Sequence, residues 1–209
     1  MTAHVLRFFP EYVALRELAG SGAFGRVRFA MFRRRCAAPA WGGWLLDPER
    51  SGGGIFDLLI HDADMCLHVF GKPATLSASG SCDRSSGVDC ISAQLTYPDG
   101  GVVEICGGWY APGEYPFSME YSVAFESGSI EYSSLHQPPV LYRQGDAPQP
   151  AALSPCDAYA AEIAYFAGCC NEGRQPERCP PAESALAVKL MELILDSRNR
   201  KGVKMVCSL

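Results

Sequence analysis

The spacing of hydrophobic and polar positions changes along the chain, and each change marks a different kind of element. From residue 74 to residue 142, apolar and polar side chains alternate, which is typical of half-buried strands. On both sides of this region, prolines, glycines and capping residues delimit longer segments that predict helices. The predicted strands of the alternating region cover residues 75–82, 88–97, 102–110, 117–126, 129–134 and 140–143. The predicted helices cover residues 11–18, 55–70, 155–172 and 181–198.

Further short strands are expected outside the alternating region, at residues 4–9, 26–35 and 203–207. The turns within the region are short, for example at residues 98–101 and 127–128. Short turns require antiparallel neighbours, because a parallel pair needs a crossover of a dozen or more residues. Strands gathered in one stretch between helices predict an α+β fold, with a large, mostly antiparallel sheet and helices packed on one face.

Such a sheet leaves its second face to be covered. Four aromatic side chains lie among the predicted strands and are candidates for an apolar surface there: Tyr110, Tyr121, Phe125 and Tyr132. We therefore expect the open face of the sheet to join copies of the chain into a homo-oligomer.

Composition narrows the class of protein without naming a function. The chain has 209 residues, of which 48% are hydrophobic, and this profile and length predict a single globular domain over residues 1–209. A net charge of −5 argues against a nucleic acid as partner. No apolar stretch is long enough for a membrane span, and residues 1–10 do not resemble an export signal, so we expect a cytoplasmic protein.

Residues 20–25, G-S-G-A-F-G, satisfy the G-x-G-x-x-G pattern of nucleotide-binding loops. A dinucleotide loop follows a strand and opens a helix, whereas here the predicted helix comes first and the strand follows. A protein kinase would also need a strand lysine, a catalytic loop and a metal-binding D-F-G, yet the first lysine is Lys72 and the later motifs are absent from the sequence. We interpret the loop as a helix–strand turn.

A second motif is more informative. The helix over residues 55–70 is apolar apart from Asp62 and four side chains spaced four, three and four positions apart: Asp57, His61, Asp64 and His68. This spacing places the four on one stripe of the helix. A carboxylate one turn from a histidine can orient the imidazole and raise its pKa, as a general acid/base requires. Three interpretations stay open: an acid/base pair, a stripe that is only solvated or structural, and a metal site made by Asp57, His61 and Asp64.

Residues 51–64, S-G-G-G-I-F-D-L-L-I-H-D-A-D, resemble the G-G-x-x-x-D-x-x-x-H-x-x-D motif of the glucose–fructose oxidoreductase and inositol 2-dehydrogenase (Gfo/Idh/MocA) family. Residues 7–10 (R-F-F-P), 21–27 and 157–166 (D-x-Y-x-x-E-x-x-x-F) are similar to the C-terminal half of the same family. The resemblance extends over nearly the whole chain, and residues 51–64 are its most specific part.

The resemblance implies a function and roles for individual residues. Members of the family oxidise or reduce a carbon of a sugar, inositol or related polyol with NAD or NADP. His61 is then the catalytic acid/base, and Asp57 orients and assists it. Asp64, Arg35 and Trp44 are expected to meet the substrate, in a pocket between this domain and a Rossmann domain.

The family's cofactor half has no counterpart in this sequence. Neither its strand–glycine–helix fingerprint nor its Glu-Lys-Pro motif occurs, so we expect no cofactor-binding residues and no bound cofactor in this chain. We expect no metal either, because no further clustered ligand accompanies Asp57, His61 and Asp64 in the sequence. The resulting hypothesis is a substrate-binding and oligomerisation domain, inactive without a Rossmann domain in cis or in trans. The alternative is a standalone binding or scaffold module that has lost redox chemistry, so whether the chain is itself an enzyme stays open.

Overall fold

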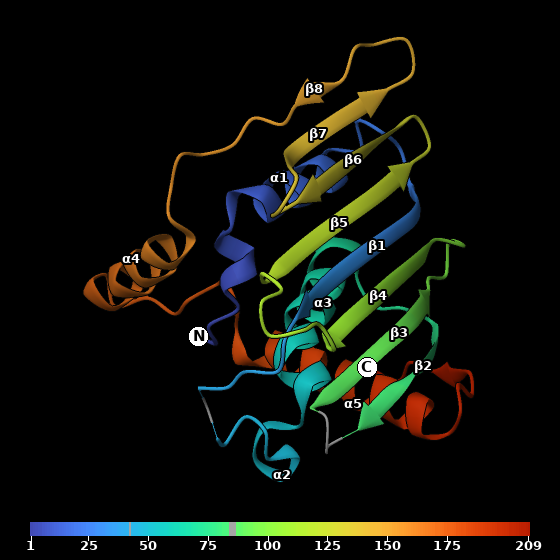
Figure 1. Cartoon of the computed structure of the whole chain (residues 1–209). Coiled ribbons are helices and arrows are strands. Elements are labelled where there is room, and N and C mark those ends of the chain that lie inside the picture. The colour runs from blue at the N-terminus through green and yellow to red at the C-terminus, as the bar shows by residue number, and fades with distance from the viewer. Residues whose placement is uncertain (42, 84–86) are drawn as a thin grey trace.

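The computed structural model describes residues 1–41, 43–83 and 87–209 and shows one sheet with helices on one of its faces (Figure 1). The strands follow the spatial order β8-β7-β6-β5-β1-β4-β3-β2-β9. Their bounds are β1 Val27–Cys36, β2 Thr75–Asp83, β3 Val88–Thr96, β4 Val102–Trp109, β5 Ser118–Phe125, β6 Gly128–Ser133, β7 Gln137–Arg143, β8 Gln149–Pro150 and β9 Met205–Val206. The predicted α+β class is confirmed, and the six strands of the alternating region lie within a few residues of their predicted bounds.

Strand β1 enters the sheet between β4 and β5, which are consecutive in sequence. It pairs antiparallel with β5 and parallel with β4, whereas every other pairing is antiparallel within the described residues. The strands of the alternating region therefore do not form one continuous meander. For the site, this means that the carboxyl ends of the central strands β1 and β4 lie side by side, at the same end of the sheet.

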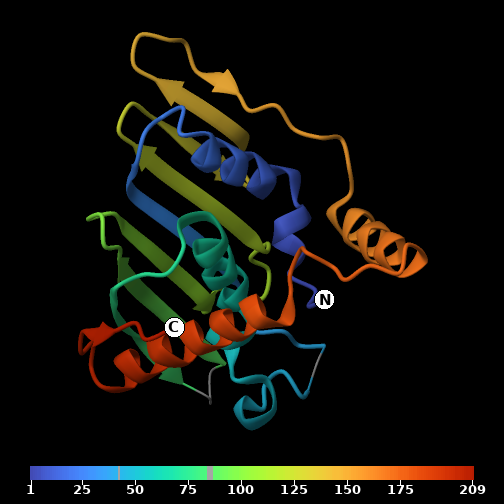
Figure 2. The same ribbon diagram turned by 180° about the vertical axis from the view of Figure 1, so that it is seen from behind.

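The helices α1 (Pro10–Ser21), α3 (Gly54–Phe70) and α5 (Pro181–Asn199) cover the same face of the sheet (Figure 2). Helix α4 (Ala158–Asn171) lies beyond the edge of this layer, next to the N-terminal segment, and α2 (Pro48–Ser51) is a single turn. Residues 4–9 are not a strand as predicted: Val5–Phe8 form a 3₁₀ helix, η1. Leu6, Arg7 and Phe8 are all buried in it, so no alternating pattern of exposure exists there.

The predicted apolar second face is wrong in its residues. Tyr121 and Tyr132 are buried on the helix-covered side, where their rings pack against Tyr12 of α1. Phe125 is buried as well, and Tyr110 is exposed beyond the end of β4. The three buried rings help to fill the layer between the sheet and its helices, so they do not form an open apolar surface.

The opposite face of the sheet carries charged side chains instead. Arg33 and Arg35 alternate with buried Arg34 along β1, and both bond the carboxylate of Glu120 on β5. Association of copies through this face stays a prediction. The side chains that the face offers to a second copy are ion-paired residues, not the aromatic rings that we expected. No helix of the described residues has the length and apolar character that crossing a bilayer requires.

Candidate functional site

Three consecutive glycines set the start of α3. Gly52 and Gly53 have φ angles of 79° and 85°, in the left-handed region that side chains other than glycine rarely adopt. A Cβ at Gly54 would lie 2.5 Å from Cδ2 of Trp109, the last residue of β4. The glycines therefore let the first turn of α3 rest directly on the end of β4.

A buried carboxylate fixes this first turn. Oδ2 of Asp89 accepts a hydrogen bond from the backbone N–H of Ile55 at 3.1 Å, which satisfies one of the unpaired donors of the helix end. Oδ1 of Asp89 accepts from Nη1 of Arg198, on α5, at 2.7 Å. Asp89 thus connects β3 with α3 and α5, and it fixes the position of the first turn of α3 relative to the sheet.

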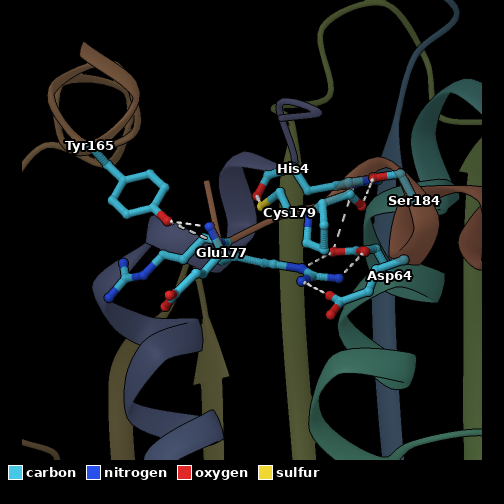
Figure 3. Close-up of polar contacts among 10 residues, drawn as sticks. His4, Asp64, Tyr165, Glu177, Cys179 and Ser184 are labelled. Atoms are coloured by element: carbon cyan, nitrogen blue, oxygen red, sulfur yellow. Dashed lines mark hydrogen bonds and ion pairs between the residues drawn. The ribbon is translucent and has the colours of Figure 1, made fainter. Parts of the chain in front are cut away.

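The four stripe residues meet different surroundings. Asp57, His61 and His68 are half-buried, whereas Asp64 is buried. Nε and Nη2 of Arg7 donate to the two carboxylate oxygens of Asp64, at 2.8 and 2.7 Å (Figure 3). Arg7 also pairs with Glu183 at the start of α5. Asp64 is therefore held in a structural ion pair, and the structure does not present it to a substrate.

Asp62 is the charged residue of α3 that lies outside the stripe, and it faces the sheet. Its carboxylate accepts from Nε and Nη2 of Arg34 at 2.8 and 2.9 Å, and both side chains are almost fully buried. Nη2 of Arg34 also lies 3.4 Å from the hydroxyl of Tyr12. This pair was missed from sequence, although an arginine in phase with buried Ala30 and Phe32 on β1 is a signal that an anion lies opposite.

The predicted substrate contacts Arg35 and Trp44 lie on different elements, β1 and the loop before α2. Arg35 points to the face opposite α3, where it donates to Oγ of Ser118 and to Glu120. The structure does not bring it to Asp57 or His61, because neighbouring residues of a strand point to opposite faces. Trp44 is 48% exposed in the loop before α2, and α2 contacts α3.

His61 is held neutral by its environment. Burial lowers its pKa to about 4, the positive charge of Arg34 acts in the same direction, and Asp62 and Asp64 offset the two only in part. This is opposite to the predicted rise in pKa, because the effect of burial is larger than that of the nearby carboxylates. Nδ1 of His61 is buried and has no hydrogen-bond partner within the described part of the chain.

Asp57 lies one turn before His61 but is not among the charged groups that shift the histidine's pKa within the described residues. Burial raises the pKa of the Asp57 carboxyl, and no charge or hydrogen bond of the described residues offsets this effect. The two predicted catalytic side chains are thus neighbours on the helix, and both lack the partners that Asp62 and Asp64 have.

His68, the last stripe residue, lines a separate cavity of about 500 Å³ together with Arg7, Arg16 and Glu183. Burial lowers its pKa to about 4, with Arg7 and Arg16 acting in the same direction. Asp64 lies between His61 and His68 on the helix, and its ion pair with Arg7 divides the stripe into two regions.

The structure offers neither a metal site nor a dinucleotide site in its described residues. No group of three His, Cys, Asp or Glu side chains among them is placed to hold a metal ion. The glycine-rich residues 20–25 comprise the last two residues of α1 and the turn after it, where Gly22 has φ 68° and Oγ of Ser21 donates to the carbonyl of Leu18. A helix C-terminus presents carbonyl oxygens, which do not fit a pyrophosphate, and the interpretation as a helix–strand turn is confirmed.

Comparison with known proteins decides the family. Residues 12–131, more than half of the chain, match the model of the GFO/IDH/MocA C-terminal domain. The chain belongs to the GFO/IDH/MocA family. The matched range contains α3 with Asp57 and His61, whereas Arg7 and Glu183 lie outside it.

Several similar proteins are oxidoreductases by name. Oxidoreductase P35 of Formosa agariphila is 29% identical over 139 residues, which are 63% of this chain and 42% of that protein. The structure of aldose-aldose oxidoreductase from Caulobacter crescentus, complexed with glycerol, superposes with a TM-score of 0.83 and 21% identity, over 99% of this chain and 63% of that one. Levoglucosan dehydrogenase with NADH and levoglucosan gives a TM-score of 0.84 at 15% identity, over 100% and 66% of the two chains. At these identities the two structures show a shared fold, and in each case the chain spans less than two thirds of its relative.

Proposed function

We propose that this chain is the substrate-binding and acid/base domain of an NAD- or NADP-dependent oxidoreductase that acts on a sugar, inositol or related polyol. In this proposal the domain is inactive until a dinucleotide-binding domain, in cis or in trans, supplies the cofactor. The observation that carries the proposal is His61, a neutral imidazole with an unpartnered buried nitrogen on the helix that the family model matches. A buried polar atom without a partner costs stability, so its retention favours a functional role.

The proposed chemistry of this chain is proton transfer. A neutral imidazole is a proton acceptor, and the lowered pKa keeps His61 in this form near neutral pH. His61 takes the proton of a substrate hydroxyl during oxidation and returns it during reduction. Asp57, with no partner of its own in the described residues, lies one turn away and orients the imidazole and the hydroxyl. Trp44, exposed in the loop before α2, is the proposed contact with the apolar side of a sugar ring.

A bound nicotinamide would supply the hydride acceptor and donor. Among the described residues the glycine-rich loop follows a helix C-terminus and does not fit such a group, so the proposal assigns that half of the reaction to a second domain. Helix α4 supports this division, because Tyr159, Ile163 and Phe166 are 58%, 68% and 46% exposed at intervals that place them on one face. Exposed apolar stripes of this kind mark surfaces that pack against a partner.

The test compares the chain alone with the chain joined to the dinucleotide-binding domain of aldose-aldose oxidoreductase. Each protein is incubated with NAD⁺ or NADP⁺ and with glycerol, myo-inositol or levoglucosan, and formation of reduced nicotinamide is followed by absorbance. We expect turnover only in the joined protein, and a loss on the order of 10²- to 10⁴-fold for His61→Ala. His136→Ala, an exposed histidine in the turn between β6 and β7, is the matched control.

Two results would contradict the proposal. Turnover by the chain alone would show that it carries its own cofactor site. Undiminished turnover in the His61→Ala protein would remove the acid/base role. Binding of a polyol by the chain, measured by calorimetry, without turnover in either protein would favour the standalone binding module.

A further inference from the structure

His4 is a buried histidine outside the motif that contains His61. It is the residue before η1 and is 5% exposed. Its backbone is fixed on both sides, since its N–H donates to the carbonyl of Thr2 at 3.0 Å and its carbonyl accepts from the N–H of Arg7 at 3.0 Å. The N–H of Thr2 donates in turn to the carbonyl of Cys179 at 2.9 Å, which ties this segment to the residues before α5.

The side chain of His4 lies between two residues of α3. Its Nδ1 is 3.7 Å from Oδ2 of Asp64, the oxygen that also accepts from Nε of Arg7. Its ring meets the ring of His61 edge to face, with centroids 6.5 Å apart and an angle of 84° between the planes. Because Asp64 and His61 are one turn apart, the imidazole of His4, just before η1, lies against both.

The charged and titratable groups that act on His61 come from three elements. Asp62 and Asp64 belong to its own helix, Arg34 comes from β1, and His4 comes from the N-terminal segment. Both aspartates are paired with arginines. Burial lowers the pKa of His4, Asp64 opposes this, and Arg7 adds to it. His4 covers one side of the His61 ring, and the charge of a protonated His4 lowers the pKa of His61 in the same direction as burial does.

We propose that His4 is a positioning residue for His61, whose buried ring keeps water from the inner side of the His61 imidazole and holds that ring in one orientation. The proposal rests on the proposed function of His61, and it adds a residue from outside the matched range of the family model. Its physical basis is that burial is the largest cause of the lowered pKa of His61, and the ring of His4 packs against the His61 ring. Shortening the His4 side chain opens space beside His61 that water can enter.

The test is an NMR pH titration of the imidazole signals in the full 209-residue chain. With four histidines, single variants assign every signal. In the unsubstituted chain we expect His61 to titrate near 4. In His4→Ala the midpoint of His61 moves upward toward 6.5, the value of a solvated imidazole. In His4→Phe, which restores an apolar ring of similar size, the midpoint stays low. His136→Ala controls for the loss of any histidine and leaves the midpoint of His61 in place.

An unchanged His61 midpoint in His4→Ala would overturn the proposal. If His4→Ala does not fold, as judged by circular dichroism, His4→Phe decides, because a midpoint raised toward 6.5 despite the aromatic ring would also overturn it. The titration needs no cofactor or turnover, so its result is independent of the acid/base test on His61→Ala. In the joined protein, His4→Ala is expected to move the acid limb of the kcat–pH profile upward and to leave KM unchanged, a pattern that simple loss of folded protein does not produce.

Discussion

Helix α3 carries three aspartates, and two of them differ from the third in their partners. Asp62 and Asp64 each accept two hydrogen bonds from one buried arginine, Arg34 and Arg7. Asp57 has no such partner within the described residues, and burial raises the pKa of its carboxyl. The first two therefore hold the helix against its neighbours, whereas Asp57 and adjacent His61 retain polar atoms that a bound molecule can satisfy.

The difference follows from the cost of burying charge. An ionised carboxylate inside a protein needs an opposite charge with good hydrogen-bond geometry, and the arginines supply it for Asp62 and Asp64. A half-buried carboxylate without a partner is tolerated at the edge of the structure and is destabilised in its charged form. The ion pairs with arginine therefore distinguish the structural aspartates of α3 from the candidate catalytic Asp57. The spacing of the aspartates along the helix does not distinguish them.

The largest expected effect on stability comes from breaking the ion pair between Asp62 of α3 and Arg34 of β1. Asp62→Asn removes the negative charge with little change in volume and leaves the guanidinium of Arg34 buried without a counter-charge. Removing one partner of a buried ion pair costs about 3–5 kcal/mol of the free energy of unfolding. Urea denaturation followed by circular dichroism measures this loss.

A double variant sharpens the same comparison. Replacing both partners, as in Arg34→Met with Asp62→Leu, removes the uncompensated charge and is expected to restore most of the lost stability. A double variant as unstable as Asp62→Asn would show that the ion pair is not the reason for the loss. The loss would then come from other contacts of Arg34, such as that with Tyr12.

The strands were predictable because their information is local. Turn residues and alternation over residues 75–134 determine where each strand begins and ends, and the structure agrees within a few residues. The place of β1 between β4 and β5 was not predictable in this way, since it depends on pairing between segments far apart in sequence. Residues 4–9 look like a strand locally, but burial of Leu6, Arg7 and Phe8 against different neighbours selects η1 instead.

In the candidate site, too, the features within one helix were predictable from sequence, and those that depend on distant segments were not. Asp57 and His61 were identified from spacing and from the motif, both of which lie within one helix. Their surroundings were not, because Arg34 is 28 positions from Asp62 and Arg7 is 57 positions from Asp64. Burial of His61 by these distant segments is the largest cause of its lowered pKa, and Asp57 is not among the groups that act on it, so the direction of the shift was predicted wrongly.

The histidines of the stripe provide a smaller, pH-dependent test. Folding lowers the pKa of His61 and of His68 from 6.5 to about 4. The unfolded chain therefore binds protons first as the pH falls, and the free energy of unfolding decreases as pH falls from 6.5 toward 4. Replacing His61 by leucine removes its share, so the decrease over this window becomes shallower than in the unsubstituted chain.

Urea denaturation at both ends of the window measures this slope. His136→Leu, in the exposed turn between β6 and β7, is the matched control and is expected to keep the slope of the unsubstituted chain. If the free energy of unfolding falls with pH equally steeply in His61→Leu and in the unsubstituted chain, His61 is not held neutral by the fold. The contrast with the permanently charged pairs on the same helix would then disappear.

The smallest expected effect on stability belongs to Asp57. Asp57→Asn keeps the shape of the side chain and removes a charge that has no partner within the described residues. We expect a change within about 0.5 kcal/mol in the free energy of unfolding, as for substitutions away from paired buried charges. Turnover of the joined protein should nevertheless fall, because the carboxylate proposed to orient His61 is gone. A loss of stability as large as that of Asp62→Asn would mean that Asp57 is a third structural ion, and α3 would then hold no aspartate reserved for chemistry.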